Sequence, residues 1–183
     1  MGNKGIITQF SRANMGKLMA TCANMGYNRI NTKGTHMEIA VTGARATTPQ
    51  DNETIKKAVQ AHTSANWHIG DAKGADSTAT EQAHNQGDKV TIYHADKKLG
   101  KGGFAKRSME MIDGAIALGA TKLLAFPNKS CPTDCTPKKP FNGHGSGTWG
   151  TIAYAKKKGL EIELHPLTAD AQKPDWLKQL SLL

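Results

Sequence analysis

From Met37 onward, short β-rich runs alternate with helix-length segments, and this order constrains the fold more than any other feature of the chain. Such alternation is typical of repeated βαβ units, which build a parallel sheet covered by helices. Five strands are expected, over Glu38–Thr42, Trp67–Gly70, Lys89–His94, Lys122–Phe126 and Leu160–Leu164. The sequence therefore predicts an α/β fold with a mostly parallel sheet of about five strands.

Helices are expected in the gaps between these strands. The first begins with Thr48 as N-cap, Pro49 at the first helical position and Asp51 three residues after the cap, which supplies acceptors to free amides. The others are expected over about Asp76–Asn85, Phe104–Leu118 and Gly147–Lys158. In the third, helical spacing predicts a sheet-facing side made of Ala105, Met109, Ile112 and Ile116. Helices on both faces of the sheet make this a Rossmann-like three-layer fold.

The length of 183 residues fits one domain with short appendages. Residues 37–167 are expected to form the domain, and residues 168–183 a C-terminal helix. Residues 1–36 form a basic extension with five Lys or Arg residues and no acid, in which Met15, Leu18, Met19, Cys22 and Met25 are spaced as in a short amphipathic helix. An alternative keeps Met37 as the native start, with the extension partly disordered or foreign to the protein.

The composition limits where in the cell the protein is expected and which ligands it is expected to bind. No run approaches the ~20 apolar residues of a membrane helix, no signal peptide is evident, and three cysteines suggest no disulfide framework. A cytoplasmic protein is expected. The net charge is +9, but five of these charges lie in the extension and only four remain, which suits the phosphates of a small ligand. With 5% aromatic residues as well, a nucleic-acid partner is disfavoured.

Candidate ligand-binding residues follow the predicted strands, at the sheet edge where such folds bind ligands. Gly43 and Arg45 follow the first strand, where glycine lets backbone approach a ligand and arginine can bind a phosphate or carboxylate. The second strand runs into a turn that opens a helix and whose free amides form an anion site, with Gly70, Asp71, Gly74 and Asp76. Both aspartates are equally explained as caps of this turn.

A second turn of this kind follows the fourth strand and the long loop 127–145. It consists of Gly145, Ser146, Gly147 and Thr148, and it also opens a helix. Between the two turns in the sequence lies a glycine- and lysine-rich loop with Lys101, followed by Arg107 near the start of a helix. A cation at this position is repelled by the positive end of the helix dipole, and a bound anion would relieve the repulsion. A simply solvated loop is the alternative.

Taken together, residues 37–167 resemble the SLOG superfamily, specifically its YspA-like branch, which is related to DprA and to the lonely-guy phosphoribohydrolases. The resemblance is carried in order by residues 41–45, 70–76, Ala95-Asp96, Gly100-Lys101, Arg107, Met111, 125–127, Gly147-Thr148, Ala155 and Lys158-Gly159. It implies a Rossmann-like sheet that binds nucleotides, NAD-like or ADP-ribose-like molecules. In some members it implies cleavage of an N-glycosidic bond, and it also implies a homodimer or higher homo-oligomer.

One departure from the family pattern separates binding from hydrolysis. Hydrolase members carry a glutamate three residues after the threonine of Pro-Gly-Gly-x-Gly-Thr-x-x-Glu, whereas this chain has Thr151 there and His144-Gly145 where Pro-Gly would stand. The phosphate-binding turn is kept and the standard glycosidase machinery is not. Of the carboxylates left for an N-glycosidase, Asp76 and Asp71 are the catalytic candidates.

We therefore expect a protein that binds a nucleotide-type small molecule such as a nucleoside monophosphate, NAD or ADP-ribose, as a sensor or sequestering protein. An N-glycosidase acting on such a molecule is the alternative, and a nucleic-acid-binding module is the second alternative. No cofactor is expected to be required. Zinc is not expected either, because Cys131, Cys135 and His144 offer three ligands at loose spacing and lack a fourth.

Overall fold

We describe the chain from a computed structural model, which covers residues 36–143 and 145–178. The amphipathic helix expected in the N-terminal extension lies outside these residues, as do His144 and the last five residues. In the part of the chain that the structure describes, no helix is both long enough and apolar enough to cross a membrane.

Five parallel strands form one sheet, which confirms the predicted fold class. They are β1 (Met37–Gly43), β2 (Ala65–Gly70), β3 (Lys89–Tyr93), β4 (Lys122–Phe126) and β5 (Glu161–Leu164). Their spatial order is β3-β2-β1-β4-β5, with Ile39 of β1 opposite Trp67 of β2 and Val41 of β1 opposite Leu124 of β4. The strand order therefore reverses between β1 and β4, and such a switch point is where sheets of this kind bind ligands.

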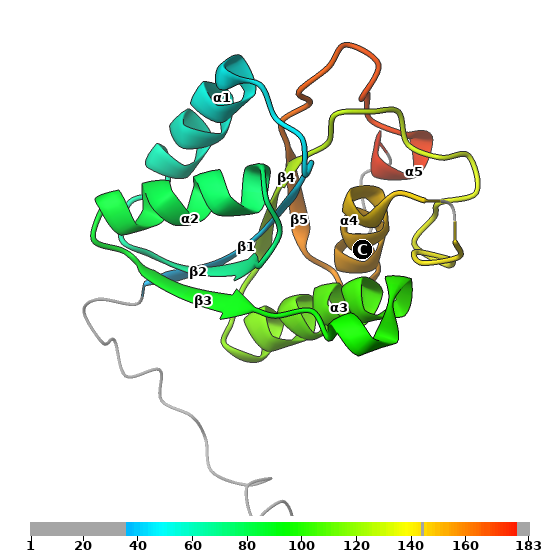
Figure 1. The fold of residues 1–183 in the computed structure, drawn as a ribbon, viewed down its shortest axis with the longest axis horizontal. Helices are drawn as coiled ribbons and strands as arrows, with labels where there is room; N and C mark the ends of the chain where they lie inside the picture. Colours follow the sequence, from blue (N-terminus) through cyan, green and yellow to red (C-terminus); the bar gives the residue numbers. More distant parts are fainter. Residues whose placement is uncertain (1–35, 144, 179–183) are drawn as a thin grey trace, which may run out of the picture. The chain divides into compact units, whose positions relative to one another are not determined.

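Helices cover both faces of the sheet and make three layers (Figure 1). One face carries α1 (Pro49–Gln60) and α2 (Ala75–Asn85), packed on a core that includes Ile39, Val41, Trp67 and Ile69. The other face carries α3 (Lys101–Ala117) and α4 (Gly147–Lys157), packed on a core that includes Ala40, Leu123, Trp149 and Ile152. A 3₁₀ turn, η2 (Lys97–Leu99), precedes α3.

The predicted start of α1 is confirmed. Thr48 Oγ1 accepts a hydrogen bond from the Asp51 amide at 3.2 Å, and Asp51 Oδ2 accepts one from the Thr48 amide at 2.8 Å. Pro49 takes the first helical position, where its missing N–H costs nothing. Two of the amides that a helix leaves without partners are thus satisfied by side chains.

The prediction for α3 needs two corrections. The helix begins at Lys101, inside the segment expected to be a glycine-rich loop. Its fully buried side chains are Arg107, Ser108, Met111, Ile112 and Ala115, whereas Ala105, Met109 and Ile116 are only half-buried. Apolar spacing misplaced this face because the first buried turn of the helix carries polar side chains.

The C-terminal helix is described only over α5 (Asp175–Lys178). The Trp176 ring meets the Trp149 ring edge to face, with 6.4 Å between the centroids. This contact and Leu177 pack α5 against the core under α4.

Candidate ligand-binding site

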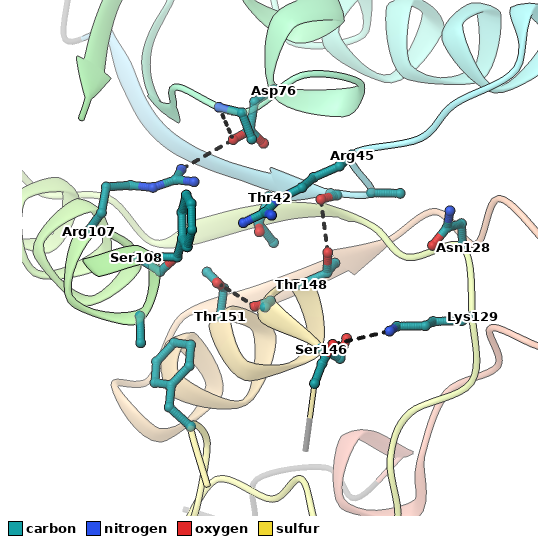
Figure 2. Close-up of a pocket in the computed structure, with 18 of the residues that line it drawn as sticks. Thr42, Arg45, Asp76, Arg107, Ser108, Asn128, Lys129, Ser146, Thr148 and Thr151 are labelled. Atoms are coloured by element: carbon teal, nitrogen blue, oxygen red, sulfur yellow. Dashed lines mark hydrogen bonds and ion pairs between the residues drawn. The ribbon is translucent and has the colours of Figure 1, made fainter. Parts of the chain in front are cut away.

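A pocket of about 690 Å³ lies at the carboxyl ends of β1 and β4, where the strand order reverses. Its walls come from the β1–α1 loop, the start of α2, the first turns of α3, the loop after β4 and the start of α4 (Figure 2). The volume falls within the roughly 300–1,000 Å³ of small-molecule sites. The fold thus brings five separate segments of the chain to one cavity.

The amino end of α4 forms one wall and is open. Ser146 is the N-cap, and its hydroxyl accepts a hydrogen bond from the Trp149 amide at 3.3 Å. Thr148 Oγ1 donates to the Gly43 carbonyl at 2.9 Å and ties the helix to the end of β1. A Cβ on Gly145 or Gly147 would meet no atom within 4 Å. Among the described residues, the amides of Gly147 and Thr148 have no hydrogen-bond acceptor, and both residues line the pocket.

Arg45 supplies a cation that carries no compensating charge. Its side chain is exposed at the pocket edge, and its guanidinium carbon lies 4.3 Å from the centre of the Phe104 ring. Across residues 36–143 and 145–178, no carboxylate forms an ion pair with it. A guanidinium held over an aromatic ring keeps its donors free for a planar or tetrahedral anion.

Asp76 and Arg107, which both line the pocket, form a buried ion pair. Arg107 Nη1 lies 3.2 Å from Asp76 Oδ2, and the residues are 7% and 4% exposed. Burial raises the pKa of Asp76 above its ordinary value, although the neighbouring guanidinium acts in the opposite direction. Figure 2 shows the arginine reaching across from α3 to this carboxylate at the start of α2.

Gly70 makes this ion pair sterically feasible. A Cβ on Gly70 would lie 1.1 Å from Arg107 Nη1 and 2.6 Å from Asp76 Oδ2. Gly70 therefore leaves space for the Arg107 guanidinium. Gly70 itself does not line the pocket.

The β2–α2 turn is closed by the protein's own groups. Gly74, at a φ of +77°, packs against the Ala44 and Arg45 carbonyl groups, each 2.5 Å from a hypothetical Cβ. The Ala75 amide donates to the Ala44 carbonyl at 2.9 Å, and the Ala72 amide donates to Asp76 Oδ2 at 3.4 Å. Of the two expected anion-binding turns, only the one at α4 remains open.

Asp71 also lies away from the pocket. Its Oδ2 accepts a hydrogen bond from the Ala95 amide at 3.1 Å and lies 3.6 Å from His94 Nδ1. Burial raises the pKa of Asp71, but the Ala95 hydrogen bond and the charge of Arg107 outweigh it and lower the pKa overall. Asp71 therefore holds the end of β3 in place as an ionised acceptor.

Eight of the twelve residues expected to bind the ligand line the pocket, namely Gly43, Arg45, Asp76, Arg107, Gly145, Ser146, Gly147 and Thr148. Gly70, Asp71, Gly74 and Lys101 do not. Lys101 begins α3, and its side chain is outside the description. Gly43 has a packing role in addition, because a Cβ there would lie 2.3 Å from Ala75 Cβ.

Several lining residues were not expected from the sequence. Asn128 and Lys129 follow β4 directly, so the same strand-end rule would have found them. Asn128 donates to the Ala46 carbonyl at 3.1 Å, and Lys129 Nζ donates to the Gly145 carbonyl at 3.3 Å. Phe104 and Phe141 bring aromatic rings to the walls, and no sequence pattern marks Phe141.

The two cysteines of the long loop are free thiols. Cys135 is fully buried, and burial together with the neighbouring Cys131 raises its pKa to about 12. The described residues contain no group of three His, Cys, Asp or Glu side chains arranged to hold a metal ion. His144 lies outside them, so its part in the expected absence of zinc stays untested.

Comparison with known proteins supports the fold. No family profile and no curated protein matches the sequence. The X-ray structure of DNA processing protein A (DprA) from Streptococcus pneumoniae is similar, with a TM-score of 0.51 and 19% identity over 70% of this chain. The described part of the chain therefore shares its fold with this part of the DprA structure. It spans 50% of the DprA chain, and at this identity the likeness concerns the fold alone.

Proposed function

We propose that the pocket binds a nucleotide-type small molecule and that its phosphate lies at the amino end of α4. The observation that carries the proposal is that two features line the same pocket at the switch point of the sheet. One is the open start of α4, and the other is the Arg45 guanidinium, which forms no ion pair with any described residue. A helix start offers amide donors and a positive dipole end to an anion. The proposal makes the protein a sensor or carrier that needs no cofactor.

The walls supply a chemically distinct surface for each part of such a ligand. The amides of Gly147 and Thr148 would donate hydrogen bonds to phosphate oxygens, and Arg45 would donate a charge-assisted pair of hydrogen bonds. Phe104 and Phe141 offer aromatic surface within the same cavity. A ligand with both an anionic and an aromatic part uses these features better than a simple anion does.

Binding is tested by incubating the protein with AMP, GMP, IMP, NAD and ADP-ribose, ultrafiltering, and identifying the retained compounds by mass spectrometry. The bound compound is then titrated calorimetrically against wild type and Arg45→Ala. Loss of charge-assisted hydrogen bonds worth about 1.5–3 kcal/mol predicts an affinity about 10- to 100-fold lower.

The matched control is Lys56→Ala, which also removes one positive charge but lies on α1, paired with Glu53 and outside the pocket wall. Its affinity should equal that of wild type. If Arg45→Ala binds as tightly as Lys56→Ala, the phosphate does not lie at this wall.

An N-glycosidase is the second candidate, because Asp76 is the carboxylate among the described residues that lines the pocket. Its raised pKa suits a general acid, and cleavage of a ribosyl bond requires a carboxylate near the sugar. Thr151 argues for binding instead, since its hydroxyl donates to the Gly147 carbonyl at 2.9 Å where hydrolases would have a glutamate. Free base in the filtrate, abolished by Asp76→Asn, would establish the enzyme.

The similar solved structure belongs to a DNA processing protein, so a nucleic-acid ligand needs its own test. Binding of a fluorescent single-stranded oligonucleotide is measured at increasing salt. An affinity that falls steeply with salt, reflecting several released counterions, would favour the nucleic-acid module. The proposed function predicts no such binding at physiological salt.

A further inference from the structure

Three polar groups in the pocket wall have no hydrogen-bond partner. Arg107 Nε is buried and unpaired. The hydroxyls of Thr42 and Ser108 also lack partners among the described residues, and all three residues are 7% exposed and line the pocket. Buried polar groups in folded proteins are nearly always hydrogen-bonded, so the unpaired Arg107 Nε calls for an explanation. The two hydroxyls are additional polar groups of the pocket wall that a ligand could use.

These groups lie on one side of the sheet, between β1 and α3. The register pairs Ala40 of β1 with His68 of β2, and because successive residues of a strand alternate between its faces, Thr42 and Gly70 lie on the same face of the sheet as this pair. The Arg107 guanidinium occupies the space where a Gly70 side chain would be, and Ser108 is the next residue on α3. In Figure 2, Arg107 and Ser108 lie at the left of the view, Thr42 lies at its centre and Lys129 at its right.

The cluster carries no uncompensated positive charge, unlike the wall at Arg45, because Arg107 forms ion pairs with two carboxylates. Asp71 Oδ1 lies 3.8 Å from Arg107 Nη2. Asp76 Oδ2 lies 3.2 Å from Arg107 Nη1 and compensates its charge. The unpaired Nε–H can only donate a hydrogen bond, and each hydroxyl can donate one as well. The chemistry therefore suits an uncharged hydrogen-bond acceptor better than a second phosphate, which would gain more from the uncompensated Arg45.

We propose that Thr42, Arg107 and Ser108 form the base subsite of the pocket and that they recognise a base bearing a ring carbonyl, as in hypoxanthine, guanine or uracil. This inference rests on the proposed nucleotide function. A carbonyl oxygen has two lone pairs and can accept from two of these donors at once. The Phe104 ring, from the preceding turn of α3, lines the same pocket, and since the Arg45 guanidinium lies over the ring, the base would contact the ring surface that Arg45 leaves uncovered.

The test compares IMP with AMP, in which an oxo group is exchanged for an amino group at one ring position. Titration calorimetry of wild type should show IMP binding about threefold to tenfold more tightly than AMP, the effect of one hydrogen bond. Ser108→Ala and Thr42→Val should each lower the affinity for IMP by a similar factor. Neither should change the affinity for ribose 5-phosphate, which carries the phosphate without a base.

Arg45→Ala separates the two parts of the ligand, because it should weaken IMP and ribose 5-phosphate alike. Circular dichroism melting confirms that each variant is folded, and Ser108→Ala decides alone if Thr42→Val is unstable. AMP binding as tightly as IMP, or equal losses for ribose 5-phosphate and IMP in Ser108→Ala, would overturn the base subsite while leaving the nucleotide function intact. Failure of all nucleotides to bind wild type would overturn both.

Discussion

Replacing Gly70 by alanine should lower the stability of the protein because the added methyl group would disturb the buried ion pair between Arg107 and Asp76. The added Cβ would lie 1.1 Å from Arg107 Nη1 and 2.3 Å from its Cζ, so the guanidinium has to move. Arginine is flexible enough to do so, but the move carries it away from Asp76, which is 4% exposed. The carboxylate would then be buried without its counter-ion.

Breaking a buried pair by removing one partner costs about 3–5 kcal/mol. Here the arginine is displaced and not removed, and it can retain part of the interaction from the pocket side. We therefore expect Gly70→Ala to lower the free energy of unfolding by about 2–3 kcal/mol. In an Asp76→Ala/Arg107→Ala background neither side chain lies close to the added Cβ, and the additional cost of Gly70→Ala should fall below about 1 kcal/mol.

Urea unfolding followed by circular dichroism measures all four members of this cycle. Gly102→Ala is the matched control, because a Cβ there meets no atom within 4 Å and the residue lies in α3. That substitution should be neutral or stabilising by up to ~1 kcal/mol. A Gly70→Ala protein within about 1 kcal/mol of wild type, or one with the same cost in both backgrounds, would refute the assignment of Gly70 to the ion pair.

Three further predictions concern stability. Partial burial raises the pKa of Glu163, but hydrogen bonds from Lys122, His165 and His62 lower it to about 2, so the carboxylate stabilises the fold above pH 4.5. That stability should be lost between pH 4.5 and 2, and Glu163→Gln should flatten this part of the pH profile of urea midpoints. Thr48→Ala removes the cap of α1 and should cost about 1 kcal/mol in urea unfolding, whereas Thr48→Ser should not. Thr148→Val loses the bond to the Gly43 carbonyl and should also cost about 1 kcal/mol, with Thr148→Ser close to wild type.

The central strands β1 and β4 were predictable because each contains a short continuous run of apolar residues, whereas the edge strands β3 and β5 alternate apolar and polar residues. The predicted bounds of β4, Lys122–Phe126, are those of the structure, and the other strands begin or end within two residues of their predicted positions. Parallel strands buried on both faces give this continuous signal. The strand order depends on contacts between distant segments, so no local pattern predicts it. The structure shows it through the pairing of β1 with both β2 and β4.

The pocket was partly predictable because parallel strands bring their carboxyl ends to one edge. That rule placed Arg45, Asp76 and the α4 turn together without knowledge of any contact. It could not place Phe141, which lies in a long loop with no periodicity. The ring packs where Gly150 leaves space on α4, since a Cβ there would lie 2.6 Å from the ring.

The two glycine-rich turns show that the sequence alone does not reveal whether a glycine leaves space for a ligand or allows close packing within the protein. At α4 the glycines leave the helix start open, since Gly147 has no neighbour in the way of a side chain. At α2 the Ala44 and Arg45 carbonyl groups pack against Gly74, and the Ala75 amide is already bonded to the Ala44 carbonyl. Both patterns look alike in sequence, but only one leaves donors for a ligand. We therefore expect one anion site in the pocket, and the proposed function favours a ligand with a single terminal phosphate over one whose charges must occupy both turns.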